Sequence, residues 1–200
     1  MTVVDGCASD APKANGGYDL AVIGAGSAGF SAAIAAAELG ANVALVGHGM
    51  IGGTCVNVGC VPSKTMIRAV EAVHHAETAS RFAGIRTDGG IADWAAVVRQ
   101  KDELVSSLRQ AKYFDLLPSY NTVAYREGRA RLTNDGVMVN GEPIKVGKVI
   151  IATGAAAAMP SIPGLENVPY LTPSLIHTLP RRPIATTHAH CAAAPQTNKT

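Results

Sequence analysis

The sequence predicts an α/β domain built on a parallel β-sheet, with inserted helices and a small antiparallel β-meander. Three observations support this fold class. An apolar segment, a glycine-rich turn, an Ala-rich segment and a second apolar segment together form a βαβ unit of about 30 residues. Two segments with helical periodicity follow, and the pattern then changes to short strands separated by turns. With 200 residues, 48% of them hydrophobic, the chain can bury a core without disulfides.

The first βαβ unit begins with Tyr18–Ile23, a short apolar run after two glycines that predicts a buried parallel strand. Phe30–Leu39 is rich in alanine and predicts a helix. Gly40 is a suitable residue to end that helix. Asn42–Val46 predicts a second buried strand.

Two longer segments have apolar residues at helical spacing. Lys64–Ala79 carries them at positions i, i+3, i+4 and i+7, which predicts an amphipathic helix. The pattern returns in Asp93–Leu117, where Asp93 is a candidate N-cap and Pro118 a stop. We therefore expect two helices between the cysteine-containing segment and the later strands.

Short strands are predicted after Pro118. They are Thr122–Tyr125, Arg129–Leu132, Val137–Val139 and Lys145–Val146, with turns at Asn134-Asp135-Gly136 and Asn140-Gly141. A further buried strand, Val149–Ala152, is followed by Thr153-Gly154. Prolines from Pro160 to Pro183 then indicate a linker.

The sequence predicts little regular structure at either end of the chain. We expect a flexible leader at residues 1–17, a structured domain at 18–178 and an unstructured tail at 179–200. The leader lacks the features of a secretory signal, no apolar run reaches the ~18 residues of a membrane span, and the net charge is only +2. These features predict a cytoplasmic protein with no nucleic-acid or membrane partner. Cys7 is expected to be an exposed free thiol, and the grouping of His188, His190 and Cys191 is attributed to chance.

The glycine-rich turn Gly24-Ala25-Gly26-Ser27-Ala28-Gly29 matches G-x-G-x-x-G. Gly24 permits a tight turn, Gly26 lets a pyrophosphate approach the backbone, and Gly29 allows close helix–strand packing. The N–H groups at the start of the following helix, around Ser27 and Ala28, then favour phosphate binding. The alternative is a glycine-rich turn in an unrelated α/β protein.

One expected residue of a dinucleotide site is missing. The second strand of such a fold usually ends in Asp or Glu, which binds the ribose hydroxyls. Here it ends in Val46-Gly47-His48-Gly49. Either the backbone and His48 hold the ribose, or affinity falls roughly 10- to 100-fold, because a charge-assisted hydrogen bond is lost.

The segment Gly52–Lys64, which reads GGTCVNVGCVPSK, contains Cys55 and Cys60. A disulfide requires Cα atoms within about 7 Å, and Gly59 lets the backbone bend enough to bring them together. Thiols near a helix N-terminus have a lowered pKa, which favours thiol–disulfide exchange. The alternatives are two buried structural cysteines or, less well supported by the spacing, a zinc site.

This segment, in its order with the glycine loop and the Ala152-Thr153-Gly154 motif, resembles the flavin-dependent pyridine nucleotide–disulfide oxidoreductases. The resemblance covers residues 18 to about 178 and implies a Rossmann-like FAD-binding domain that is incomplete. Within the family, the likeness is greatest to the mercuric reductases. The segments that carry it are Ile51–Ala69, Leu108–Tyr113, Arg126–Leu132 and Ile162–Pro173.

The resemblance implies roles for individual residues. Cys60 would face the flavin, Cys55 would be the interchange thiol that meets the substrate, and Lys64 would lie near the flavin and stabilise its reduced ring. Further contacts to FAD would come from the glycine loop and from Gly49, Thr54, Ala130, Thr153 and Gly154.

The activity implied is the FAD- and NADPH-dependent reduction of Hg(II) to elemental mercury, with Hg(II) bound transiently by Cys55 and Cys60. Hg(II) is a soft cation that prefers thiolate sulfur. No second strand and glycine loop follow residue 180, so we expect the NADPH site and the interface domain of the family homodimer to be absent and the chain to be inactive alone. The alternatives are reduction of a glutathione- or lipoamide-type disulfide, and a non-catalytic module that binds FAD or Hg(II).

Overall fold

The computed structural model describes residues 17–134 and 136–172. Its main element is a four-stranded parallel sheet with strand order β3-β2-β1-β7. The strands are β1 (Tyr18–Ile23), β2 (Val43–Gly47), β3 (Val123–Glu127) and β7 (Val146–Ile151). The predicted α/β class is confirmed, and so is the βαβ unit, because β1 and β2 pair in parallel with Ala21 opposite Ala44.

Two layers cover the central strands. Helix α1 (Ser27–Glu38) packs on one face, where Phe30 and Ala33 contact Val22 and Leu45. An antiparallel meander covers the other face, through Val137 and neighbouring apolar residues. The meander consists of β4 (Ala130–Thr133), β5 (Gly136–Val139) and β6 (Glu142–Ile144). The central strands are therefore buried on both faces, which explains their continuous apolar sequence.

The strands after Pro118 differ from the prediction in two respects. The segment predicted as Thr122–Tyr125 is β3, Val123–Glu127, which joins the parallel sheet beside β2. The two strands predicted at Lys145–Val146 and Val149–Ala152 are one strand, β7. The Asn140-Gly141 turn is confirmed, with φ of 52° and 89°. The Asn134-Asp135-Gly136 turn includes residue 135, which lies outside the described residues.

The prediction that Val149–Ala152 is a buried strand is wrong. Val149, Ile150 and Ile151 are 37%, 40% and 62% exposed. Strand β7 pairs with β1 on one side and forms an edge of the sheet. An apolar run predicts a strand, but it does not tell whether other elements cover it.

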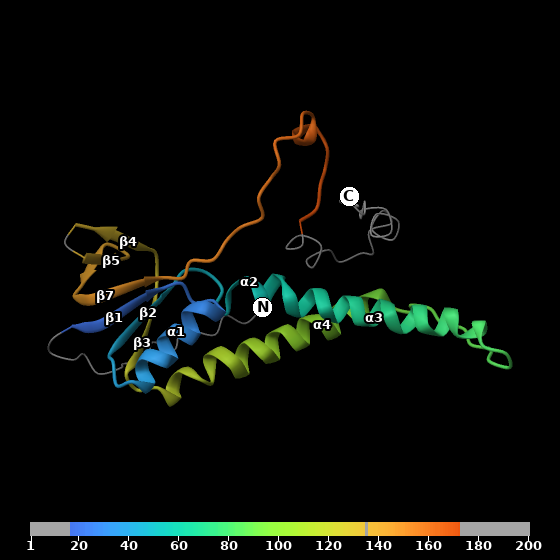
Figure 1. Cartoon of the computed structure of the whole chain (residues 1–200), viewed down its shortest axis with the longest axis horizontal. Coiled ribbons are helices and arrows are strands. Elements are labelled where there is room, and N and C mark those ends of the chain that lie inside the picture. Colours follow the sequence, from blue (N-terminus) through green and yellow to red (C-terminus); the bar gives the residue numbers. More distant parts are fainter. Residues whose placement is uncertain (1–16, 135, 173–200) are drawn as a thin grey trace, which may run out of the picture.

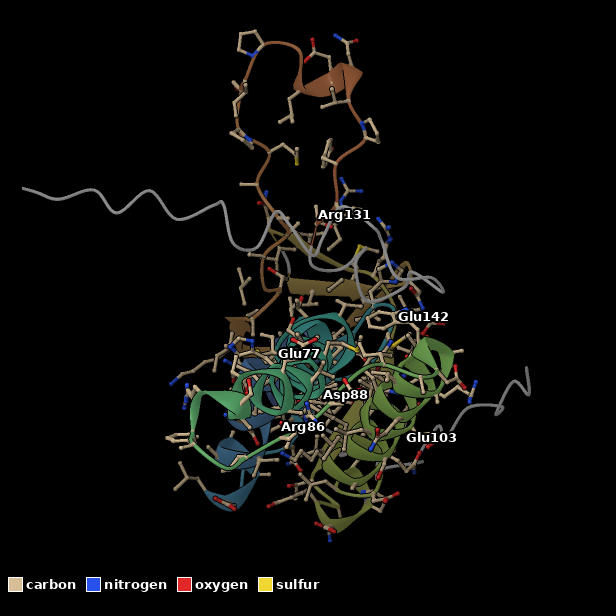
Figure 2. The ribbon with its side chains drawn as sticks, turned by 90° about the vertical axis from the view of Figure 1, so that its right-hand side faces the viewer. Glu77, Arg86, Asp88, Glu103, Arg131 and Glu142 are labelled. Carbon is tan, nitrogen blue, oxygen red and sulfur yellow. The ribbon has the colours of Figure 1, made fainter. Side chains whose placement is uncertain are left out.

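A helical hairpin projects from the sheet (Figure 1). It is formed by α3 (Cys60–Thr78) and α4 (Trp94–Arg109), and the short helix α2 (Gly53–Val58) precedes it. Figure 2 views the hairpin from its tip, with the exposed side chains of Glu77, Arg86 and Asp88 near that end. No helix within the described ranges is both long and apolar enough to cross a membrane.

Both predicted helices have different bounds in the structure. Helix α3 begins at Cys60 and not at Lys64; Pro62 lies in its first turn, where a missing N–H leaves no hydrogen bond unmade. Asp93 caps α4 as predicted, by accepting a hydrogen bond from the Ala96 N–H at 3.1 Å. Helix α4 ends at Arg109, and Gln110–Phe114 forms a π-turn before Pro118.

The flanking regions are mostly outside the description. The leader, except Gly17, and the tail from residue 179 are not described, and neither are Cys7, His188, His190 and Cys191. Residues 152–172, which include the start of the predicted linker at Pro160, contain only the 3₁₀ turn Leu165–Asn167 as regular structure.

Candidate functional site

The glycine loop lies at the carboxyl edge of the parallel sheet, between β1 and α1. Two of its glycines are required by close backbone contacts. A Cβ built on Gly24, whose φ is 123°, would lie 2.1 Å from the Ala152 carbonyl oxygen. A Cβ on Gly29 would lie 1.7 Å from the Gly24 carbonyl oxygen. Both positions therefore exclude side chains, as the motif predicts.

The loop also presents the start of α1 to solvent. Gly26 is the N-cap residue and has no side chain to accept the first N–H groups of the helix. A Cβ built on Gly26 would meet only the Cα of Gly53, at 3.6 Å, so its outer side is open. Ser27 and Ala28, in the first turn, are exposed. This arrangement can accept an anionic group such as a pyrophosphate at a helix N-terminus.

The cysteine segment is attached directly to the glycine loop. The Gly52 N–H donates to the Ala25 carbonyl oxygen at 2.8 Å, and Gly52 forms a parallel β-bridge with Gly26. Gly53 approaches so closely that a Cβ on it would lie 2.8 Å from the Gly26 Cα. The glycine loop and the cysteine segment are separate in the sequence, but these contacts place them side by side at the carboxyl edge of the sheet.

Gly59 separates α2 from α3 and brings the two cysteines together. A Cβ on Gly59 would lie 2.8 Å from the Thr54 carbonyl oxygen and 3.3 Å from the Cys55 Cα, so only glycine allows this close approach. Cys55 lies on α2 and is partly buried, whereas Cys60 is exposed as the first residue of α3. Both are free thiols.

The two thiols interact through a hydrogen bond. The pKa of Cys55 is raised, mainly because its thiol donates a hydrogen bond to the Cys60 side chain. Burial and the charge on Cys60 raise it further. The Cys60 backbone N–H and the charge on Lys112 act in the opposite direction. The lowered pKa predicted from helix N-termini is therefore wrong for Cys55, because its neighbour's sulfur outweighs the helix contribution.

Side chains that the sequence analysis missed hold the cysteine segment in place. The Asn57 amide donates to the carbonyl oxygens of Ile51 at 2.9 Å and Gly53 at 2.8 Å. Its Oδ1 accepts a hydrogen bond from Arg109 Nη1 of α4 at 2.9 Å. The position of Asn57 between the cysteines was visible in the sequence, but nothing in the helical pattern indicated Arg109.

Tyr113 connects three parts of the site. Its hydroxyl is 3.1 Å from Ser27 Oγ, and its ring packs edge-on against Phe30, with ring centroids 4.7 Å apart. The ring also lies against Gly52, since a Cβ there would be 3.1 Å from Tyr113 Cε2. The π-turn buries Tyr113 at this position, and such turns are frequent at functional sites.

Other predicted site residues lie around the same edge. Thr153 and Gly154 follow β7 and are exposed, and the Thr153 nitrogen lies near Gly24. Thr54 is exposed on α2, and Gly49 is exposed after β2 with φ of 80°. Lys64 is exposed on α3, one turn after Cys60, and Ala130 begins β4. Their predicted contacts to a cofactor remain predictions.

Strand β2 itself ends without an acid, and Glu127 of the neighbouring β3 is paired with Gly47. Gly47 is buried, and its carbonyl oxygen accepts the Gly128 N–H at 2.7 Å. His48 is exposed, and its Nε2 accepts a hydrogen bond from Arg129 Nε at 3.2 Å. Within residues 17–134 and 136–172, no three His, Cys, Asp or Glu side chains are grouped as a metal site.

Comparison with known proteins identifies the family. Residues 18–179 match the pyridine nucleotide-disulphide oxidoreductase family. The chain belongs to this family. Membership implies a flavin and a nicotinamide cofactor, and the fold is that of the FAD-binding part of a disulfide reductase.

The resemblance to mercuric reductases is also confirmed. The chain is 49% identical to the mercuric reductase of Staphylococcus aureus over 158 residues, which cover 79% of this chain and 29% of that protein. It is 38% identical to the dihydrolipoyl dehydrogenase of Acholeplasma laidlawii over 151 residues, 75% of this chain and 44% of that protein. The chain thus spans less than half of either relative.

A solved structure supports the fold. The HOCl-induced flavoprotein disulfide reductase RclA of Escherichia coli superposes with a TM-score of 0.63 at 29% sequence identity. The match covers 82% of this chain and 34% of that chain.

The residues of the edge fit a flavin dinucleotide in part. The glycine loop provides a cradle that side chains would fill, and the cysteine segment lies beside it. The adenosine end lacks the carboxylate expected for the ribose, because that position is Gly47.

Proposed function

We propose that this chain provides the FAD site and the redox-active cysteine pair for NADPH-dependent reduction of Hg(II) to elemental mercury. One observation carries the proposal: two free thiols, Cys55 and Cys60, interact at the edge that also presents the glycine loop. The similarity to mercuric reductases supports Hg(II) as the substrate.

FAD, when bound, would carry two electrons from a nicotinamide to the cysteine pair. The N–H groups at the start of α1 would bind its pyrophosphate. Gly49, Thr54, Ala130, Thr153 and Gly154 would line the remaining cofactor surface. Lys64, one turn beyond Cys60, would place a positive charge beside the flavin.

The cysteine pair would both exchange electrons and bind the metal. Reduction of a Cys55–Cys60 disulfide takes up two electrons and two protons and yields two thiols. Reduction of Hg(II) bound by these thiols to the element requires a further two electrons, which NADPH would supply by way of the flavin. Two sulfurs within reach of each other are suitable ligands for a soft cation, and their deprotonation would release protons on binding.

The metal-binding part of the proposal can be tested on the chain itself. Cys7 and Cys191 are first replaced by Ser, so that the remaining thiols are Cys55 and Cys60. We expect one Hg(II) per reduced chain by mass spectrometry, and none after Cys55→Ala and Cys60→Ala are added. Equal binding with and without the pair would contradict the proposal.

Turnover gives a second test. NADPH absorbance is followed with FAD and Hg(II) present, and a protein-free sample is the control. A rate above the control that is lost in Cys55→Ala and Cys60→Ala would support the proposed reaction, and a rate that these variants keep would contradict it. The alternative substrate class is tested in parallel with lipoamide and oxidised glutathione; exchange of the pair with these disulfides in the absence of Hg(II) binding would favour that alternative.

A further inference from the structure

The carboxyl end of β2 is the position at which a dinucleotide fold usually presents an acid to the ribose. In this chain the residue is Gly47, which is buried. It pairs with Glu127 on β3, and its only functional groups are those of the backbone. Some other group must bind the ribose hydroxyls if affinity is to be retained.

The space beside Gly47 is occupied by a side chain from the neighbouring strand. A Cβ built on Gly47 would lie 2.7 Å from the Tyr125 hydroxyl oxygen and 2.6 Å from the Ala25 Cβ. Tyr125 pairs with Leu45, two residues before Gly47, so its ring extends along the sheet toward the end of β2. The hydroxyl therefore lies between the end of β2 and the glycine loop, where the side chain of an acid would begin.

The chemistry of Tyr125 suits this position. Its side chain is partly buried, and the burial, followed by the charge on Glu127, raises the pKa of the phenol. The hydroxyl therefore stays protonated and able to donate.

Two other residues near the end of β2 are less suitable. His48 Nε2 already accepts the hydrogen bond from Arg129. Glu127 pairs with Gly47, but the three atoms nearest to a Cβ built on Gly47 belong to Ala25 and Tyr125. The Tyr125 hydroxyl is the polar side-chain group nearest to that Cβ.

We propose that the Tyr125 hydroxyl replaces the missing acid and hydrogen-bonds the ribose in the adenosine part of bound FAD. This inference rests on the flavin site of the proposed function. A neutral hydroxyl contributes less than a carboxylate, so the site would bind more weakly than one with an acid, but not as weakly as one with no partner.

The test compares Tyr125→Phe with the unchanged chain. Affinity for FAD is measured by flavin fluorescence, and we expect it to fall about threefold to tenfold, the effect of one neutral hydrogen bond. ADP, used as a competitor, should lose affinity by the same factor because it carries the ribose. FMN, which has no adenosine, should bind both proteins equally.

Tyr120→Phe is the matched control. Its hydroxyl lies 3.4 Å from Glu38 Oε1 near the end of α1, at the opposite edge of the sheet. This variant should bind FAD and ADP like the unchanged chain. Thermal unfolding by circular dichroism establishes that both variants are folded.

The outcomes separate the two proposals. If the unchanged chain binds neither FAD nor ADP, the flavin site of the proposed function is wrong, and this inference with it. If it binds both and Tyr125→Phe binds them equally well, only the role of Tyr125 is overturned. Equal losses for FAD and FMN would also overturn it, as would a loss on Glu127→Gln without one on Tyr125→Phe.

Discussion

The two ends of the candidate site are built in different ways. At the cysteine end, adjacent backbone segments and side chains from α2 and α4 fix the position of Cys55 and Cys60, and Gly59 permits the close approach of α2 and α3. At the adenosine end, Gly47 has no side chain, and Tyr125 from β3 fills the space. The geometry of the cysteine end depends on one contiguous sequence motif, whereas the adenosine end depends on residues from two neighbouring strands.

This difference follows from what each end must do. A disulfide tolerates only a narrow range of Cα separations, so the residues between the cysteines are tightly constrained. A ribose needs a hydrogen-bonding group in one place, which can come from either of two adjacent strands. Parallel strands end at the same edge of a sheet, so β3 can supply what β2 lacks.

The largest effect is expected from Gly59→Ala at the cysteine end. Its Cβ would lie 2.8 Å from a backbone oxygen that cannot move without separating α2 and α3. Urea unfolding should show a loss of about 2–3 kcal/mol, typical of an overpacked site. Mild oxidation should also give less Cys55–Cys60 disulfide, measured by mass spectrometry.

Gly90→Ala is the control for this variant. No atom lies within 4 Å of a Cβ on Gly90, and its φ is not positive. Its stability should change by less than about 0.5 kcal/mol. Similar losses at both glycines would contradict the specific role of Gly59.

A smaller effect is expected from Gly47→Ala at the adenosine end. The added Cβ would lie 2.7 Å from the Tyr125 hydroxyl, which is the far end of a side chain and can shift, and 2.6 Å from the Ala25 Cβ, which moves only with the backbone of the glycine loop. We expect a loss of about 1–2 kcal/mol in urea unfolding. In the Tyr125→Phe background, Gly47→Ala should lower the free energy of unfolding by less, because the hydroxyl contact is already removed. If the two substitutions instead lower it by the sum of their separate effects, the two residues do not share this space.

The smallest effect concerns the charge state of the cysteine pair. The hydrogen bond to the Cys60 side chain is the main cause of the raised Cys55 pKa. Cys60→Ala removes it, so the pH midpoint for alkylation of Cys55 by iodoacetamide should fall. Lys112→Met should move that midpoint upward, because the lysine charge lowers this pKa. Shifts of the same sign in both variants would contradict this electrostatic account.

Local sequence patterns predicted most of the helices and strands, but not which of them are buried or which strands are neighbours in the sheet. The strand–loop–helix–strand unit and the N-cap at Asp93 could be predicted because apolar periodicity and capping are local. The same approach failed at Val149–Ile151, which is apolar but lies at a sheet edge. It also did not indicate that the strand around Tyr125 lies beside β2, because strand order depends on contacts distant in the sequence.

The sequence by itself determined the family and predicted the residues of its site: the glycine loop, Cys55, Cys60 and the absence of an acid at Gly47. Only the tertiary structure decided that Arg109 would hold Asn57 and that Tyr125 would fill the space beside Gly47. The physical reason is that motifs are constrained by local backbone geometry, which the order of residues specifies. The partners of those motifs come from helix packing and strand order, which depend on the whole chain.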